Sequence, residues 1–458
     1  MRIVSGLQPG HVLQRRPGGA NITVGGACAD SGMVLASVRR NGRCLPGWRD
    51  RPVGRAADGE FTARLVGVPP GGPYEVALVC GKSRVVVPDV FVGDLWLMAG
   101  QSNMEGCAIL PGPAEPHPLV RCFTMGRRWE QARDPLHLKA ESPDEVHGGA
   151  GVPPAVAERL RRRARAGGGV GIAFARALLE RTGVPQGLIA TAHGGTSMTQ
   201  WDPARAAKAG ASLYGSLLLS VRAIGQPLAG VLWAQGESEA LPELARVYTR
   251  RMRRLVAALR RDVGQPQLPW LLVQAGRFID IRHTTGWAWP DPHSWNRVQE
   301  QQRRLPDLIP HSAVVGSIDL ELDDCAHLDS ASLGVLATRL AAEAARLVHG
   351  DRLAPPVIRP LQPRCRGACI ELDFAHVVGG LRSAGPARGF ALLTPGGTPL
   401  PAIHKVRVQG SRATIHLACA LRRGTALCYG HGLDPVCTLS DARGMGMPVF
   451  GPLTIVGL

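Results

Sequence analysis

One serine of this chain stands in a turn directly after a long apolar run. The run covers residues 90–98, and Ser102 follows it within the sequence Ala-Gly-Gln-Ser-Asn of residues 99–103. This pattern predicts a buried strand that enters a tight turn with a hydroxyl at its tip. Because α/β sheets bind ligands beyond the carboxyl ends of their strands, Ser102 is a candidate nucleophile. Serine is also a common turn residue, so the turn alone leaves both interpretations open.

Three more polar segments come at or just past the ends of predicted strands. They are His193-Gly-Gly-Thr-Ser197 after 188–192, Gln235-Gly-Glu-Ser238 after 231–234, and Asp324-Cys-Ala-His327 after 313–318. In a parallel sheet the carboxyl ends of all strands share one edge. We therefore expect the four segments to converge on one crevice.

Together the four segments contain the groups that acyl transfer requires. A serine hydroxyl needs a base to take its proton, and His327 is the candidate for that role. Asp324 lies three residues earlier and would hold the other ring nitrogen of His327. The tetrahedral intermediate also needs donors for its oxyanion. The predicted donors are the N–H groups of Ser102, Gly194 and Gly195 and the side-chain amide of Gln235.

The same residues also have ordinary structural interpretations. An isolated Asp-x-x-His is often a helix cap, and Gly194-Gly195 alone would more often be a turn. Glu237 could interact with the dipole of a helix that begins there. Successive placement at strand ends favours a site over these alternatives. Four neighbouring residues are expected to support the site or contact substrate, with packing as the alternative for the tryptophan: Gln101, Asn103, Glu237 and Trp201.

Three regions would position these groups. Residues 1–88 read as short strands separated by turns, which suggests a small antiparallel sandwich. Residues 89–352 alternate apolar strands with helical patterns, such as the apolar stripe of 243–261, and predict a parallel sheet covered on both faces. Within them, 107–169 is rich in Pro, Gly and charge and reads as a long insertion over one edge. Residues 353–458 return to short strands.

The composition limits the class of protein. The 458 residues include 53 Lys and Arg against 36 Asp and Glu, a formal net charge of +17. A basic surface could attract an acidic partner, but the arginines mostly lie opposite apolar helix stripes, which favours solvated helix faces. No nucleic-acid-binding signature and no membrane-length apolar segment is present, so neither partner is expected. The 11 cysteines have no metal-like spacing and favour free thiols.

The four motifs resemble those of the sialate O-acetylesterase branch of the SGNH hydrolases. The matching residues are Gly93 through Glu105, His193-Gly-Gly-Thr196 leading to Trp201, Trp233-Ala-Gln-Gly-Glu237, and Asp324-Cys-Ala-His327. Weaker resemblance extends over nearly the whole chain, and 107–169 matches least. His193 departs from the Trp that is frequent there, and Cys325-Ala326 from a commoner acidic or branched pair.

The resemblance implies a flavodoxin-like α/β/α catalytic domain flanked by β-rich domains, with no metal or cofactor. It implies Ser102 as nucleophile, His327 as base, Asp324 as the residue that orients it, and Gln235 as an oxyanion donor. The expected activity is hydrolysis of O-acetyl esters on a carbohydrate, either a sialic acid or an acetylated polysaccharide such as xylan. A non-catalytic carbohydrate-binding relative is the alternative from another class. No signal segment is apparent, which predicts a cytoplasmic protein unless a leader was removed.

Overall fold

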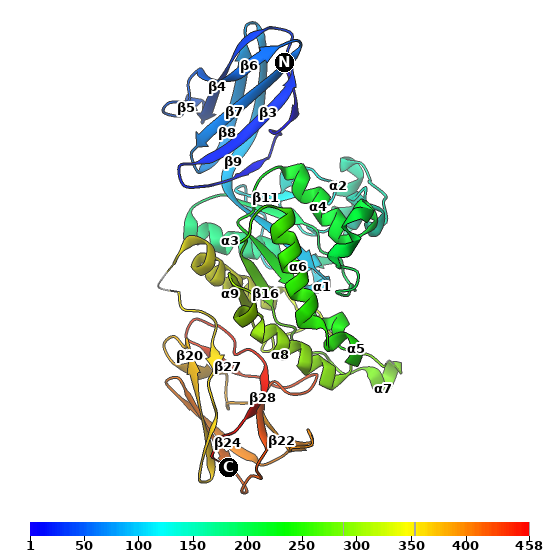
Figure 1. Cartoon of the computed structure of the whole chain (residues 1–458), viewed down its shortest axis with the longest axis vertical. Coiled ribbons are helices and arrows are strands. Elements are labelled where there is room, and N and C mark those ends of the chain that lie inside the picture. The colour runs from blue at the N-terminus through cyan, green and yellow to red at the C-terminus, as the bar shows by residue number, and fades with distance from the viewer. Residues whose placement is uncertain (287, 352–353, 458) are drawn as a thin grey trace.

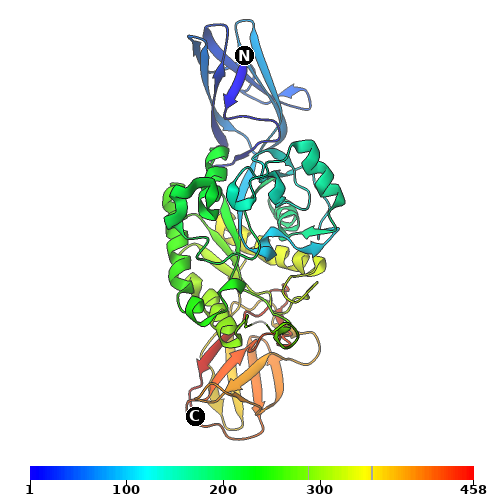
Figure 2. The same ribbon diagram turned by 90° about the vertical axis from the view of Figure 1, so that its right-hand side faces the viewer.

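The computed structural model describes residues 1–286, 288–351 and 354–457. The chain forms an elongated molecule, with strands at its N-terminal end, strands and helices in the middle, and strands at its C-terminal end (Figure 1 and Figure 2). The mixed α/β architecture predicted from the sequence is confirmed. The boundary predicted between residues 352 and 353 lies outside the described residues.

The N-terminal region is built mostly from antiparallel strands, and one short strand, residues 12–14, has a parallel partner. The strands are β1 (Arg2–Ser5), β2 (Val12–Gln14), β3 (Ala20–Ala27), β4 (Gly32–Arg40), β5 (Arg43–Cys44), β6 (Arg51–Ala57), β7 (Glu60–Val68) and β8 (Gly71–Cys80). The main path of the sheet is β1-β3-β7-β6-β4-β8. Along β7, buried Phe61, Ala63 and Leu65 alternate with exposed residues, the pattern of a sheet with one covered face.

One long strand, β9 (Ser83–Gly100), joins this region to the middle of the molecule. Its first half pairs antiparallel with β8, and its second half pairs parallel with strands of the central sheet on both sides. Figure 1 shows it running from the N-terminal strands into the helical region. The strand that ends just before Ser102 is therefore held by two parts of the fold.

The central sheet is parallel apart from one edge strand. Its other strands are β11 (Val120–Phe123), β12 (Trp129–Gln131), β14 (Gln186–Ala190), β15 (Gly230–Ala234), β16 (Trp270–Val273) and β17 (Ser312–Val315). They pair in the order β12-β11-β14-β9-β15-β16-β17, with β12 antiparallel. The strands β11, β12 and β14 lie on one side of β9, and the later strands β15, β16 and β17 lie on the other. The order therefore reverses beside β9, which is where α/β sheets place their ligands.

Helices flank this sheet on both faces. They are α1 (Ser102–Glu105), α2 (Pro154–Arg163), α3 (Val170–Thr182), α4 (Leu213–Ile224), α5 (Pro242–Ala245), α6 (Tyr248–Asp262), α7 (Arg282–Thr285), α8 (Pro292–Leu308) and α9 (Ser330–His349). Alternate residues of β9 belong to different cores. Leu95 and Leu97 pack with residues of α4, α6 and α8, whereas Trp96 and Met98 pack with residues of α3 and α9.

Two segments differ from their predicted form. The helical pattern of 243–261 is divided into α5 and α6, which are separated by residues 246 and 247. The stretch 107–169 does not only cover the sheet, because it supplies edge strands β11 and β12 as well as β10 (Ala108–Ile109), β13 (Ala166–Gly168) and α2. These strands are two to four residues long, too short for alternation of side chains to reveal them.

The described part of the C-terminal region, residues 354–457, is built from short strands without a helix. They are β18 (Arg359–Pro360), β19 (Arg364–Arg366), β20 (Cys369–Ala375), β21 (Leu381–Ser383), β22 (Phe390–Leu393), β23 (Pro399–Leu400), β24 (Ile403–Gln409), β25 (Arg412–Leu417), β26 (Ala426–Tyr429), β27 (Leu439–Asp441) and β28 (Phe450–Thr454). All 11 cysteines are free thiols in the structure. Within the described residues, no helix is long and apolar enough to cross a membrane.

Candidate active site

Three of the predicted segments meet where β9, β14 and β15 end. The Gln101 N–H donates to the Ala234 carbonyl at 2.7 Å, and the His193 N–H donates to the Gly100 carbonyl at 3.0 Å. Gly100 adopts a φ of +126°, and a Cβ there would lie only 2.1 Å from the Ala234 oxygen. Glycine is therefore required at the end of β9, because the backbones of β9 and β15 approach too closely for a side chain.

Ser102 is the first residue of α1 and is partly exposed. First-turn N–H groups of a helix have no partner within the helix, and the Ser102 N–H has no acceptor elsewhere in the described chain. Gly194 lies beside it, since a Cβ on Gly194 would be 3.5 Å from the Ser102 Cβ. The structure thus brings the candidate nucleophile and the predicted glycine pair together.

The predicted base and its orienting carboxylate form a close pair. His327 Nδ1 lies 2.6 Å from Asp324 Oδ2, and Asp324 Oδ1 also accepts the N–H groups of Ala326 and His327 at 2.8 Å. Burial would raise the pKa of Asp324, but the His327 hydrogen bond and these two N–H donors lower it overall. Asp324 therefore stays ionised, as a residue that stabilises an imidazolium must.

Asn103 connects this pair to the serine helix. Its Nδ2 donates to the Ala326 carbonyl at 3.2 Å, and its Oδ1 accepts the Leu328 N–H at 3.1 Å. These two backbone groups flank His327 on either side. The residue after Ser102 therefore fixes the loop that carries His327 in the tertiary structure.

The thiol of Cys107 also affects the imidazole of His327. The interaction with Cys107, whose sulfur accepts from the imidazolium, is the main cause that raises the pKa of His327 to about 9, against the opposing effect of burial and with further help from Asp324. Cys107 Sγ also lies 3.6 Å from the Ser102 carbonyl oxygen. The described structure has no hydrogen bond between the Ser102 hydroxyl and His327. The thiol thus occupies the neighbourhood that a serine–histidine pair would share.

The predicted oxyanion donors are not equally available. The Gly194 N–H donates to the Glu105 carboxylate, whereas the Gly195 N–H has no acceptor in the described part of the chain. Gln235 Nε2 donates to the Thr196 carbonyl at 3.3 Å and contacts Glu239 Oε1 at 3.5 Å. Ser102 and Gly195 therefore offer unoccupied N–H groups, while Gly194 and Gln235 would have to release protein acceptors first.

The four supporting residues are all near the strand ends. Gln101 is buried and its Oε1 lies 3.5 Å from the Ser238 N–H. Buried Glu237 accepts from Asn103 Nδ2 at 3.1 Å. Trp201 is fully buried and donates through Nε1 to the Thr196 hydroxyl at 2.9 Å, and this hydroxyl donates to the His193 carbonyl at 2.6 Å. Trp201 thus supports the glycine loop through Thr196, and its side chain is not accessible to substrate.

A polar cluster contributed by the 107–169 stretch was not predicted from the sequence. Lys139 Nζ lies 3.0 Å from Glu105 Oε1, and His137 Nδ1 lies 2.8 Å from the Glu105 carbonyl. His147 Nδ1 lies 2.9 Å from Nδ1 of His193, and burial lowers the pKa of both imidazoles. Glu105, three residues after Ser102 on α1, could have been noticed from helical spacing. The histidines come from a stretch with no regular pattern.

Comparison with known proteins decides the family. Residues 92–346, more than half of the chain, match the family described as carbohydrate esterase, sialic acid-specific acetylesterase. The chain belongs to this family. The resemblance inferred from the four motifs is therefore confirmed, and this carbohydrate esterase is a carboxylic ester hydrolase.

Two relatives illustrate the range of similarity. The esterase is 29% identical over 211 residues to the probable carbohydrate esterase At4g34215 of Arabidopsis thaliana, an alignment that covers 41% of this chain and 71% of the relative. The crystal structure of XAC1771, a carbohydrate acetylesterase from Xanthomonas citri, superposes with a TM-score of 0.70 at 22% identity. That match covers 97% of this chain and 99% of the other, so the two share a fold over almost their whole length.

Proposed function

We propose that this carbohydrate esterase removes O-acetyl groups by a serine mechanism, with Ser102 as nucleophile, His327 as base and Asp324 as the residue that orients the base. The observation that carries the proposal is the Asn103 side chain. It follows Ser102 directly and binds the backbone on both sides of His327. The 2.6 Å contact of His327 with Asp324 adds the third member.

The chemistry follows from these roles. Ser102 Oγ attacks the acetyl carbonyl while His327 accepts its proton through Nε2, and Asp324 stabilises the imidazolium. The N–H groups of Ser102 and Gly195 bind the developing oxyanion, joined by Gly194 or Gln235 when these release their present acceptors. The sugar hydroxyl leaves with the proton held by His327. Water, activated by the same imidazole, then attacks the acetyl-enzyme and releases acetate.

We also propose that residues 89–352 form a catalytic domain of the flavodoxin-like SGNH type, flanked by β-rich domains over 1–88 and 353–458. The parallel strand order and the two helix groups beside β9 support this assignment. The substrate is an O-acetylated carbohydrate, either a sialic acid or a polysaccharide such as acetylated xylan, and hydrolysis requires no metal or cofactor. Acetate release from a panel of such substrates distinguishes them.

Replacement of the nucleophile tests the mechanism. Ser102→Ala is expected to lower kcat for a chromogenic acetate ester by about 1,000-fold or more, because the proposed acyl-enzyme forms on the Ser102 hydroxyl. Ser197→Ala removes a serine hydroxyl from the neighbouring glycine loop and should change kcat less than about twofold. A fluorophosphonate should label the parent and Ser197→Ala, but not Ser102→Ala. Near-parental turnover by Ser102→Ala together with loss in Cys107→Ala would instead make the thiol the nucleophile.

A further inference from the structure

The exposed side of α6 carries a line of arginines along two adjoining cavities. The smaller cavity, about 290 Å³, lies between α6 and the segment 198–203. The larger, about 610 Å³, lies between α6 and residues 308–310. Arg250 and Arg254 line both cavities. We call the two cavities together the α6 groove.

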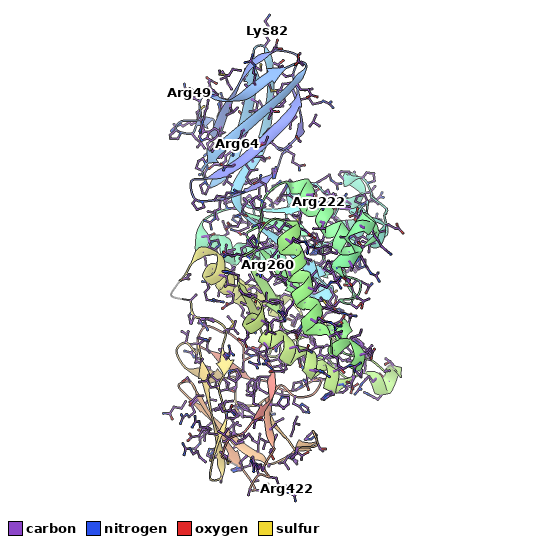
Figure 3. All side chains as sticks on the ribbon, in the orientation of Figure 1. Arg49, Arg64, Lys82, Arg222, Arg260 and Arg422 are labelled. Atoms are coloured by element: carbon purple, nitrogen blue, oxygen red, sulfur yellow. The ribbon has the colours of Figure 1, made fainter. Side chains whose placement is uncertain are left out.

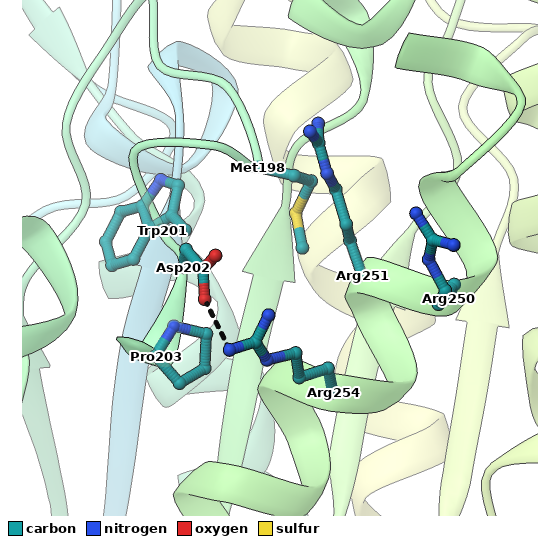
Figure 4. A pocket seen from close by; sticks show the side chains of 7 residues that line it. All are labelled: Met198, Trp201, Asp202, Pro203, Arg250, Arg251 and Arg254. Carbon is teal, nitrogen blue, oxygen red and sulfur yellow. Dashed lines mark ion pairs between the residues drawn. The ribbon is translucent and has the colours of Figure 1, made fainter. Parts of the chain in front are cut away.

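Figure 4 shows how the smaller cavity is built. Arg251 and Arg254 extend from one helix toward a loop that carries Met198, Trp201, Asp202 and Pro203, and Arg250 lies on the other side of Arg251 from this loop. Arg246 and Arg253 add further guanidinium groups on the larger cavity. Arg250, Arg253 and Arg254 lie three or four residues apart on α6 and so share a face. Arg246, just before α6, lines the same larger cavity.

Most of this positive charge is not neutralised by the protein. Arg251 and Arg254 each have one carboxylate contact, at 3.4 Å to Glu239 and Asp202. Arg246, Arg250 and Arg253 are exposed and have no acidic partner in the described chain. Elsewhere arginines commonly hold two carboxylate oxygens, as Arg127 does with Asp144 at 2.6 and 2.7 Å. Like charges spaced i, i+4 repel one another, so an anion bound in the groove would relieve this repulsion.

The length and lining of the groove indicate the kind of anion. Ten residues of helix separate Arg250 from Arg260, which corresponds to about 15 Å at 1.5 Å per residue. This length suits an extended chain with several carboxylates better than one small ion, and arginine forks bind carboxylates well. Single-stranded nucleic acid would need exposed rings for base stacking, but the lining aromatic, Trp201, is fully buried.

One contact joins the α6 groove to the candidate active site. Arg251, on the smaller cavity, lies 3.4 Å from Glu239. Glu239 also accepts the Met198 N–H at 2.6 Å and contacts Gln235 Nε2 at 3.5 Å. The smaller cavity is therefore linked to the predicted oxyanion residue Gln235 through the buried carboxylate of Glu239.

We propose that the α6 groove binds the carboxylated backbone of an acidic polysaccharide. This goes beyond the esterase activity, because binding requires charge and not ester chemistry. The choice of a polysaccharide rests on the carbohydrate esterase family of the chain. Catalysis and anchoring would then use separate surfaces of the same central region.

The test measures binding of fluorescein-labelled polygalacturonate at low and at physiological salt. The parent should bind at low salt and lose affinity steeply as salt rises. Combined replacement of Arg246→Gln, Arg250→Gln and Arg253→Gln should weaken binding by about tenfold or more. The slope of log affinity against log salt concentration should become shallower by about one for each arginine removed. Turnover of a small acetate ester should not change in this variant.

The matched control removes the same charge elsewhere. Arg49→Gln, Arg64→Gln and Arg422→Gln lie in the N- and C-terminal regions, as Figure 3 shows, and should leave affinity within about twofold. Absence of parental binding at low salt, equal loss in the control, or tighter binding of an oligothymidylate or of neutral xylan would each overturn the proposal. Because binding and acetate turnover are read separately, failure of the groove is distinguishable from failure of the serine mechanism.

Discussion

At the residue scale, the main unexpected feature is the thiol beside the candidate base. His327 Nδ1 contacts Asp324, and the interaction with Cys107 is the largest cause that raises the pKa of His327 to about 9. A general base must be neutral to accept a proton. The candidate base is therefore mostly protonated at neutral pH, and the serine mechanism should become faster as the pH rises through this pKa.

Removal of the thiol tests this relation. In Cys107→Ala the imidazolium loses its main stabilising partner, so its pKa should fall toward the ordinary value of 6.5. The rising limb of kcat/KM against pH should then move to lower pH by about one unit or more, measured with a chromogenic acetate ester. Cys325→Ala removes a half-buried thiol two residues from His327 and should leave the limb in place. A limb that stays at high pH in Cys107→Ala would contradict this account.

At the scale of elements, the site depends on the close approach of two strand ends. Gly100, the last residue of β9, packs directly against Ala234, the last residue of β15, and no side chain fits between them. The turn that presents Ser102 is therefore set by backbone contact between neighbouring strands. Helix α1 has only four residues, so it depends on this contact and on Asn103 for its orientation.

Gly100→Ala should destabilise the protein by about 3 kcal/mol or more, because an unfavourable positive φ adds to overlap with the Ala234 carbonyl. Gly225→Ala is the matched control. It also has a positive φ, +60°, but its nearest neighbour would be 4.0 Å away, so only about 1–2 kcal/mol is expected. Urea unfolding measures both free energies. Equal losses in the two variants would show that the strand contact contributes nothing.

At the scale of the whole molecule, one buried carboxylate connects three distant segments. Asp94 of β9 accepts two hydrogen bonds from Arg15, at 2.8 and 3.0 Å, and lies 3.5 Å from Nε2 of His349 at the end of α9. Its side chain is 2% exposed. The N-terminal segment, the central sheet and the last helix are thus joined at Asp94, where the parallel half of β9 begins. Ser102 follows the other end of that half.

Asp94→Ala should lower the free energy of unfolding by about 2–4 kcal/mol, because it leaves a partly buried arginine without its partner. Asp307→Ala breaks an exposed pair with Arg359 and should cost less than about 1 kcal/mol. Chemical denaturation compares the two. If Asp94→Ala costs no more than the control, this cluster does not hold the regions together.

The pattern-based predictions succeeded where side chains were apolar and regular. The strand expected at 231–234 forms as β15, which starts one residue earlier, and most of the apolar stripe of 243–261 lies in α6. Helix α8 was missed because its buried face is partly built from amides. Gln299 and Gln302 are almost fully buried, and they bind backbone groups of Gln235, Ala275 and Gly276. Hydropathy cannot reveal a buried face of this kind.

The sequence by itself indicated the family, through the resemblance of its four motifs. It also indicated the strands that carry the site and the Ser102, His327 and Asp324 candidates, because these follow from residue types near strand ends and from local spacing. Only the tertiary structure decided which groups surround them. It placed Cys107 beside His327, the Glu105 carboxylate on the Gly194 N–H and the arginines of α6 around two cavities. The physical reason is that these contacts join segments that no repeating sequence pattern relates to one another. Only the three-dimensional packing of the chain brings them together.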